Sequence, residues 1–168
     1  MPEIRYEFRI RAAPARVFEA LTKAKRVAKW WTPDCRLDQK AGGFATFRFK
    51  NDDGGLDGYS RMAIEQLVPD KLVEWRCVEQ DYQGMSDWVG TTIRFELADD
   101  GQGGTELDFA HLDWKNTEGS FERCSGGWMH VLGTSLKNYL EKGKGEPYLA
   151  HVAKEAELRE YQRKKSVI

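Results

Sequence analysis

The sequence of 168 residues predicts one α+β domain, in which a curved antiparallel sheet wraps a long C-terminal helix. Segments with a period-two alternation of apolar and polar residues, separated by short polar turns, predict about six strands. Two short helical segments follow the first of these strands. After Asp113 the apolar residues switch to helical spacing, which predicts the long helix. The length fits a single hydrophobic core.

The first elements are a strand and two short helices. Residues 4–11 place Ile4, Tyr6, Phe8 and Ile10 on one face of a half-buried strand. Pro14 suits the first turn of a helix, and the apolar residues that follow it recur at helical spacing. A second short helix is expected over about 26–31, because Thr32-Pro33 ends the helical pattern there.

The middle of the chain predicts strands joined by tight turns. Short turns rich in Gly, Asp and Asn imply antiparallel pairing of successive strands. The expected strands cover residues 44–50, 58–68, 72–79, 88–97 and 105–113.

The last third predicts the long helix, over about 120–142, and Gly143 suits its C-terminal cap. The predicted domain covers residues 1–148. Beyond Pro147, residues 149–168 are expected to form an additional charged helix that is not a separate domain. The apolar stripe of the long helix consists of Phe121, Cys124, Trp128, Val131, Leu132, Leu136, Tyr139 and Leu140.

Composition excludes several classes of function. Lys and Arg number 26 against 27 Asp and Glu, a balance that gives no general attraction to nucleic acid. The chain has no apolar run of the roughly 20 residues that membrane insertion requires, and its start does not resemble a secretion signal. The three cysteines, Cys35, Cys77 and Cys124, are widely spaced, which is typical of neither a disulfide framework nor a zinc site. The expected location is the cytoplasm.

Strand parity predicts which side chains face the helix. A packed core explains all of them, because each buried large apolar side chain contributes roughly 1.5–3 kcal/mol. The alternative is that a curved sheet leaves a pocket of about 300–1,000 Å³ between itself and the helix. The candidate ligand-binding residues are then Trp31, Phe47, Met62, Trp75, Trp88, Phe95, Phe109, His111, Cys124, Trp128 and Leu132.

His111 has two interpretations. Parity places it with Leu107, Phe109 and Asp113 on the inner face of the last strand. A buried imidazole needs a hydrogen-bond partner, so it is either a core histidine bonded to the protein or a polar contact for a ligand. In the second case its pKa is expected to fall by burial, unless a carboxylate such as Asp113 lies close enough to raise it.

The order of elements, together with several local motifs, resembles the START-like helix-grip superfamily, also called SRPBCC. The most similar group is the one named after the activator of heat-shock-protein-90 ATPase, which has bacterial members. The resemblance covers roughly residues 3–148. It rests on Ala13-Pro14-Ala-Arg-Val17-Phe18-Glu-Ala-Leu21, Trp30-Trp31, Gly42-Gly43-Phe44, Glu65 to Pro69, Leu72, Trp75, Gly104-Thr105-Glu-Leu107, His111, Gly127-Trp128, Leu132, Leu136-Lys137, Tyr139-Leu140 and Gly143.

The resemblance implies a helix-grip fold and favours the pocket, but it leaves three functions open. The first is binding or carrying a small hydrophobic molecule, such as a lipid. The second is a polyketide-cyclase-like or hydrolase-like enzyme using the same pocket. The third is a co-chaperone-like interaction module, with a chaperone partner or a homodimer. The sequence contains no GxSxG, HExxH, phosphate-loop or dinucleotide-binding motif. We therefore assign no catalytic residue, metal or cofactor, and favour a binding protein over an enzyme.

Overall fold

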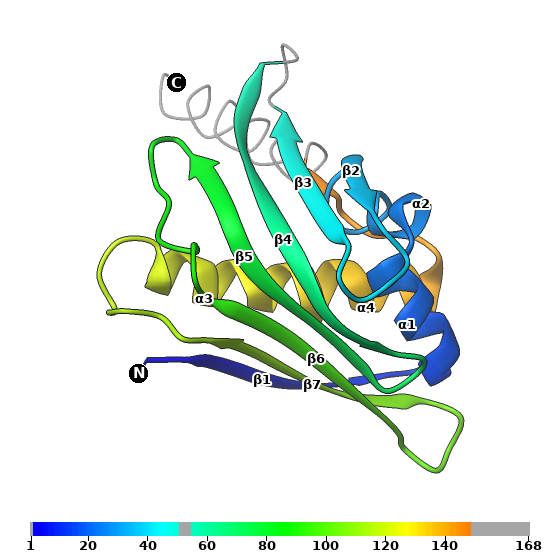
Figure 1. Cartoon of the computed structure of the whole chain (residues 1–168). Helices are drawn as coiled ribbons and strands as arrows, with labels where there is room; N and C mark the ends of the chain where they lie inside the picture. The colour runs from blue at the N-terminus through cyan, green and yellow to red at the C-terminus, as the bar shows by residue number, and fades with distance from the viewer. Residues whose placement is uncertain (1, 51–54, 149–168) are drawn as a thin grey trace, which may run out of the picture.

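The computed structural model describes residues 2–50 and 55–148 (Figure 1). One seven-stranded sheet curves around a long helix, and two short helices sit at the far end of that helix. The α+β helix-grip prediction is confirmed. The strands are β1 (Ile4–Ile10), β2 (Asp34–Leu37), β3 (Phe44–Lys50), β4 (Leu56–Val68), β5 (Leu72–Tyr82), β6 (Thr92–Asp99) and β7 (Thr105–Leu112). The helices are α1 (Pro14–Thr22), α2 (Ala24–Val27) and the long helix, which comprises α3 (Phe121–His130), η1 (Val131–Leu136) and α4 (Lys137–Lys142).

The strands follow the order β1-β7-β6-β5-β4-β3-β2, and every pair of neighbours is antiparallel. Because β1 and β2 lie at opposite edges, α1 and α2 carry the chain across the open end of the sheet. The prediction of about six strands did not include β2. This strand has only four residues, and its pairing with β3, from Asp34↔Arg48 to Leu37↔Ala45, defines it more than its own residues do.

Two predicted boundaries were wrong, one at the start of β6 and one at α2. The strand expected over 88–97 begins at Thr92, and Trp88 lies in the turn before it. The second short helix covers Ala24–Val27 and ends before Trp31.

The long helix runs from Phe121 to Lys142, and its middle segment η1 is a π-helix. Its buried residues Trp128, Leu132, Leu136 and Leu140 recur every fourth position. In an α-helix with 3.6 residues per turn, that spacing drifts by about 40° per step. A π-helix has wider turns, so η1 offsets the drift and keeps all four residues against the sheet. Gly143, at φ 81°, caps the helix by donating its N–H to the carbonyl of Tyr139.

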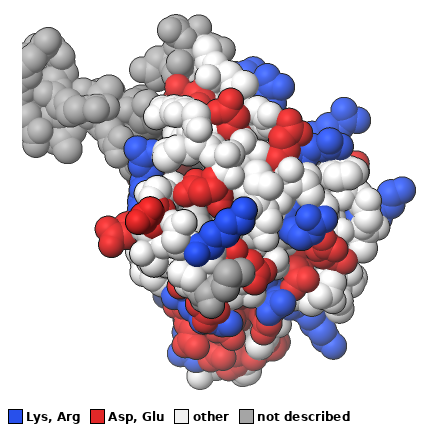
Figure 2. All heavy atoms as spheres, turned by 60° about the vertical axis from the view of Figure 1, so that its left-hand side comes forward, with Lys and Arg blue, Asp and Glu red and all other residues white. Residues whose placement is uncertain are grey.

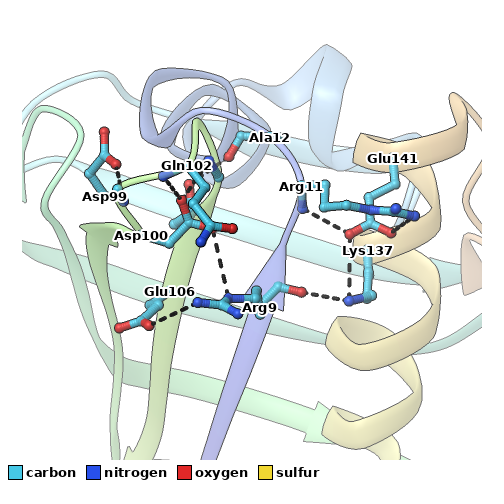
Figure 3. A network of polar contacts seen from close by, with 12 residues as sticks. Arg9, Arg11, Ala12, Asp99, Asp100, Gln102, Glu106, Lys137 and Glu141 are labelled. Carbon is cyan, nitrogen blue, oxygen red and sulfur yellow. Dashed lines mark hydrogen bonds and ion pairs between the residues drawn. The ribbon is translucent and has the colours of Figure 1, made fainter.

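A polar network holds the end of β1 to the helix and to the β6–β7 turn (Figure 3). The backbone N–H of Arg11 donates to Glu141 at 2.8 Å, and Lys137 donates to the carbonyl of Arg9 at 2.5 Å. Arg9 also approaches Asp100 at 3.8 Å. These contacts tie the end of β1 both to α4 and to the turn between β6 and β7.

On the face that Figure 2 shows, acidic and basic side chains are interspersed. This agrees with the near-zero net charge of the chain. Within the two described ranges, no helix is long and apolar enough to cross a bilayer.

Candidate functional site

A pocket of about 200 Å³ opens between one end of strands β3–β5 and the helix α3. Among the described residues, seven aromatic side chains form most of its wall, and the few polar groups are concentrated on β4, β5 and α3. It is lined by Trp31, Phe49, Tyr59, Ser60, Gln80, Tyr82, Met85, Trp88, Ser120, Arg123, Cys124, Gly127, Trp128, Val131 and Tyr148.

Four of the predicted site residues line this pocket: Trp31, Trp88, Cys124 and Trp128. The other seven are not among its lining residues. They are at most 2% exposed and belong to the packed interior: Phe47, Met62, Trp75, Phe95, Phe109, His111 and Leu132.

The concave face is filled by contacts between rings, which explains why the pocket is smaller than predicted. The ring of Trp31 lies 4.4 Å from that of Phe47, and Trp128 lies 4.7 Å from Phe109. Trp75 packs on Phe95 at 5.3 Å. With the middle of the sheet occupied in this way, the open volume falls below the 300 Å³ at the lower end of the expected range.

His111 is bonded to the protein through both ring nitrogens. The indole N–H of Trp128 donates to Nδ1 at 3.1 Å, so Nε2 carries the imidazole proton. Nε2 donates to the hydroxyl of Thr91 at 2.8 Å, and that hydroxyl donates to the carbonyl of Trp88 at 2.6 Å. The hypothesis that His111 is a polar contact for a ligand is therefore wrong; it is a core histidine with both hydrogen bonds made by side chains.

Burial lowers the pKa of His111 to about 3, and the nearby charge of Asp87 only partly opposes this. The carboxylate expected beside it, Asp113, is exposed and adopts a left-handed backbone conformation with φ 67° just after β7 ends. The placement of Asp113 on the inner face was therefore wrong. The imidazole is neutral at neutral pH.

A β-bulge in β5 brings two unpredicted residues into the pocket. The pairing of β4 with β5 runs Ser60↔Gln80 and Arg61↔Glu79, and then Met62↔Cys77, so Val78 is the extra residue. A bulge reverses strand parity beyond it. Gln80 and Tyr82 consequently lie on the inner face with Cys77. Strict alternation of side chains from Cys77 onward would have placed both on the outer face.

Ser60 stands two residues before Met62, and simple parity from Met62 would have placed it on the inner face. Its side chain is 1% exposed and borders the pocket. Among the described residues its hydroxyl has no hydrogen-bond partner. Buried hydroxyls are normally paired, so this one is an unused hydrogen-bonding group on the pocket wall.

Tyr148 closes one side of the pocket and comes from the segment after the helix. Its hydroxyl donates to Asp57 at 2.6 Å and lies 2.8 Å from the hydroxyl of Tyr82. Its backbone N–H donates to the carbonyl of Trp31 at 2.6 Å. Burial, followed by the hydrogen bond to Asp57, raises the pKa of Tyr148, so the phenol stays protonated.

The start of α3 forms the opposite wall. Asp87 accepts hydrogen bonds from the N–H and the hydroxyl of Ser120, both at 2.8 Å, and so ties the residue before this helix to the turn before β6. The indole N–H of Trp88 donates to the sulfur of Cys124 at 3.1 Å. Burial raises the pKa of the Cys124 thiol, which disfavours the thiolate form needed for nucleophilic attack.

Within the residues that the structure describes, no group of three or more His, Cys, Asp or Glu side chains is placed to hold a metal ion. The three cysteines are free thiols. Among the described residues that line the pocket, the polar groups are neutral apart from Arg123, which is exposed at its edge.

Comparisons with known proteins agree with this architecture. A search of curated proteins finds no match. Among solved structures, the Aha1 dimer from Colwellia psychrerythraea is 32% identical, covering 86% of this chain and 100% of that one, with a TM-score of 0.71. The AHSA1-like protein from Aeromonas hydrophila is 17% identical, covering 84% and 94%, with a TM-score of 0.68.

DynU16, from the dynemicin biosynthetic locus, is 20% identical with a TM-score of 0.69, covering 85% of this chain and 48% of that one. At this level of identity the likeness shows the fold alone. The family model described as "Activator of Hsp90 ATPase homolog 1-like protein" matches residues 11–141, most of the chain. With that match and the 32% identical relative, the chain belongs to the family of activator of Hsp90 ATPase homolog 1-like proteins.

Proposed function

We propose that this protein binds a small, largely apolar molecule in the pocket between α3 and the ends of β3–β5. The observation that carries the proposal is the composition of the pocket wall. Aromatic side chains surround about 200 Å³ of unfilled space, and a few polar groups are set among them. Mostly apolar walls with few polar groups are typical of ligand sites.

Two adjacent glycines in the middle of α3 support this proposal. Glycine inside a helix costs about 1 kcal/mol relative to alanine, so Gly126 and Gly127 weaken the helix that forms the pocket wall. Gly127 lines the pocket, and a Cβ atom built on it would meet nothing within 4 Å. A Cβ atom on Gly126 would meet nothing within 4 Å either, so what distinguishes Gly127 is that it lines the pocket, where a side chain would take up ligand space.

These glycines also provide a matched test. Gly127→Leu should fill the pocket, whereas Gly126→Leu makes the same change in helix propensity at a neighbouring position that does not line it. We expect native mass spectrometry to find a retained small molecule on freshly purified wild-type protein and on Gly126→Leu, but not on Gly127→Leu. A thermal-shift screen of one- and two-ring compounds covers the case in which the ligand is lost during purification.

Two results would contradict the proposal. One is that no compound stabilises or remains bound to the wild-type protein. The other is that Gly127→Leu binds as well as Gly126→Leu does.

The enzyme alternative is weakened by the geometry of His111. A general base needs a free lone pair within reach of its substrate. The lone pair of Nδ1 is already used by the indole of Trp128, and His111 is fully buried. The geometry thus favours binding over acid–base catalysis by this residue.

We also propose that the protein forms a homodimer, because its 32% identical relative from Colwellia psychrerythraea is a dimer. Light scattering coupled to size-exclusion chromatography should then give about twice the mass of the 19.3 kDa chain. A monomer across the accessible concentration range would contradict this. The family description makes an Hsp90-type chaperone the partner to test for the interaction-module alternative, by its effect on that chaperone's ATPase rate.

A further inference from the structure

Ser60 and Gln80 form a polar pair on the pocket wall. They are direct cross-strand partners on β4 and β5, and both line the pocket. Directly opposite residues of an antiparallel pair have their Cβ atoms about 4.5–5.5 Å apart. One ligand atom can therefore contact both side chains.

The orientation of the Gln80 amide is fixed by its neighbour. The backbone N–H of Trp88 donates to its Oε1 at 2.9 Å, so this atom is the oxygen and the other is the NH₂ group. No hydrogen bond joins that NH₂ group to any residue in the ranges 2–50 and 55–148. Gln80 thus offers an N–H donor beside the unpaired hydroxyl of Ser60, which is itself 1% exposed.

The size and walls of the pocket restrict the rest of the ligand. An apolar cavity of about 150 Å³ holds benzene. The space here is about 200 Å³, which suits one or two rings. The stacked indoles of Trp88 and Trp128, 5.8 Å apart at an interplanar angle of 17°, present flat surfaces against which an aromatic ring packs well.

We propose that the pocket selects a one- or two-ring aromatic compound with a neutral carbonyl oxygen, which accepts hydrogen bonds from Ser60 and Gln80. This inference rests on the proposed binding function and names its ligand class. A carboxylate is disfavoured at this position, because both donors are neutral and a buried charge needs a paired charge. Arg123, the one cation among the described lining residues, is exposed at the edge of the pocket.

The test uses three matched probes: 1-tetralone, tetralin, which lacks the carbonyl, and tetralin-1-carboxylate. Binding is followed by NMR titration, in which the indole N–H signals of Trp88 and Trp128 report contact in the pocket. We expect 1-tetralone to bind about tenfold to thirtyfold more tightly than tetralin, the ratio for two net hydrogen bonds. The carboxylate should bind more weakly than 1-tetralone.

Variants then assign the preference to the two side chains. Ser60→Ala should reduce the preference for 1-tetralone over tetralin to about threefold to fivefold, because one donor remains. It should not lower the melting temperature, because the hydroxyl has no protein partner to lose. Gln80→Glu keeps the acceptor for Trp88 but removes the other donor, and it should reduce the preference at least as much. Ser86→Ala, an exposed serine outside the pocket, is the control and should keep it.

The outcomes separate this inference from the function on which it rests. Equal affinity for 1-tetralone and tetralin, or a preference that neither variant reduces, overturns the carbonyl assignment and leaves apolar binding intact. Tightest binding of the carboxylate overturns the neutral acceptor and points to Arg123. If none of the three probes shifts the indole signals while other apolar compounds do, the assigned ligand class is wrong; if no compound does, the proposed function fails as well.

Discussion

The indole N–H of Trp128 donates a hydrogen bond to Nδ1 of His111 at 3.1 Å, and both side chains are buried between the sheet and the helix. Because an indole can only donate, this contact fixes the tautomer of the imidazole. It also couples the wall of the pocket to the core, since Trp128 lines the pocket while His111 lies behind it.

The first prediction concerns the titration of His111. Its pKa is lowered from 6.5 to about 3 by burial, so it should remain neutral in the folded protein over the range in which an exposed histidine titrates. We expect its ring ¹⁵N shifts to stay constant from pH 8 to pH 5 and to show a protonated Nε2. A midpoint near pH 6.5 would contradict the buried, fully bonded geometry.

The same shift predicts a stability change with pH. Below the unfolded pKa of 6.5, the unfolded chain binds a proton that the folded chain excludes. The free energy of unfolding should therefore fall as the pH drops from about 6 towards 3, by up to ~1.4 kcal/mol per pH unit from this group. Denaturant melts of the wild type and of His111→Gln over this range measure it. The free energy of unfolding should depend less on pH in the variant, by the contribution of about one proton.

The second prediction separates packing from hydrogen bonding at Trp128. Trp128→Phe keeps an aromatic ring but leaves Nδ1 of His111 without its donor, so we expect a loss of about 1–3 kcal/mol. Trp128→Ala also removes the buried ring and should cost about 3–5 kcal/mol. Met129→Ala, at a neighbouring position that is 44% exposed, is the control and should change stability by less than about 0.5 kcal/mol. A Trp128→Phe variant as stable as the wild type would argue against the hydrogen bond.

The third prediction concerns the hydrogen bonds that hold the start of α3. Asp87→Ala leaves both donors of Ser120 without this acceptor and should cost about 1–3 kcal/mol in chemical denaturation. Asp87→Asn keeps an acceptor and loses mainly the charge at the helix N-terminus, worth about 0.3–1 kcal/mol at low salt. Asp87→Asn should therefore lower the free energy of unfolding less than Asp87→Ala does. Glu118→Ala, an exposed acidic residue just before the helix, is the reference for a change of charge alone.

The fold was predictable because period and turn chemistry are local properties. The alternation in residues 4–11 and the stripe from Phe121 to Leu140 each define an element without any tertiary information. β2 was missed because four residues are too few to show a period, and only their pairing with β3, from Asp34↔Arg48 to Leu37↔Ala45, makes this segment a strand. The π-helical segment η1 likewise follows from the packing of Leu132 and Leu136 against the sheet.

The site was predicted only in part, because parity tells which face a side chain occupies and not whether the space beside it is filled. Phe47 and Trp128 both face inward, yet one is packed against Trp31 and Trp75 while the other also borders open space. Gln80 was missed for a different reason. The bulge at Val78 moves the side chain of Gln80 to the opposite face of the strand, and no residue pattern around Val78 predicts a bulge there.

The last prediction concerns the end of the domain. The expected charged helix over 149–168 lies outside the described residues, whereas the core cluster of buried residues extends from Ile4 to Leu140. A chain ending at Tyr148 should therefore fold with nearly unchanged stability. A chain ending at Pro147 loses the hydrogen bonds of Tyr148 to Asp57 and Trp31 and its ring contact with Phe49, 5.2 Å away.

We expect this shorter chain to lose about 1–3 kcal/mol, as for unpaired buried groups, and to bind the apolar probes less tightly because one wall of the pocket is gone. Tyr148→Phe in the longer chain removes only the hydroxyl. Its free energy of unfolding should lie between those of the chains that end at Tyr148 and at Pro147. Denaturant melts and the NMR titration with 1-tetralone measure both effects. Failure of the chain ending at Tyr148 to fold would place residues 149–168 in the core of the domain, contrary to the predicted boundary at residue 148.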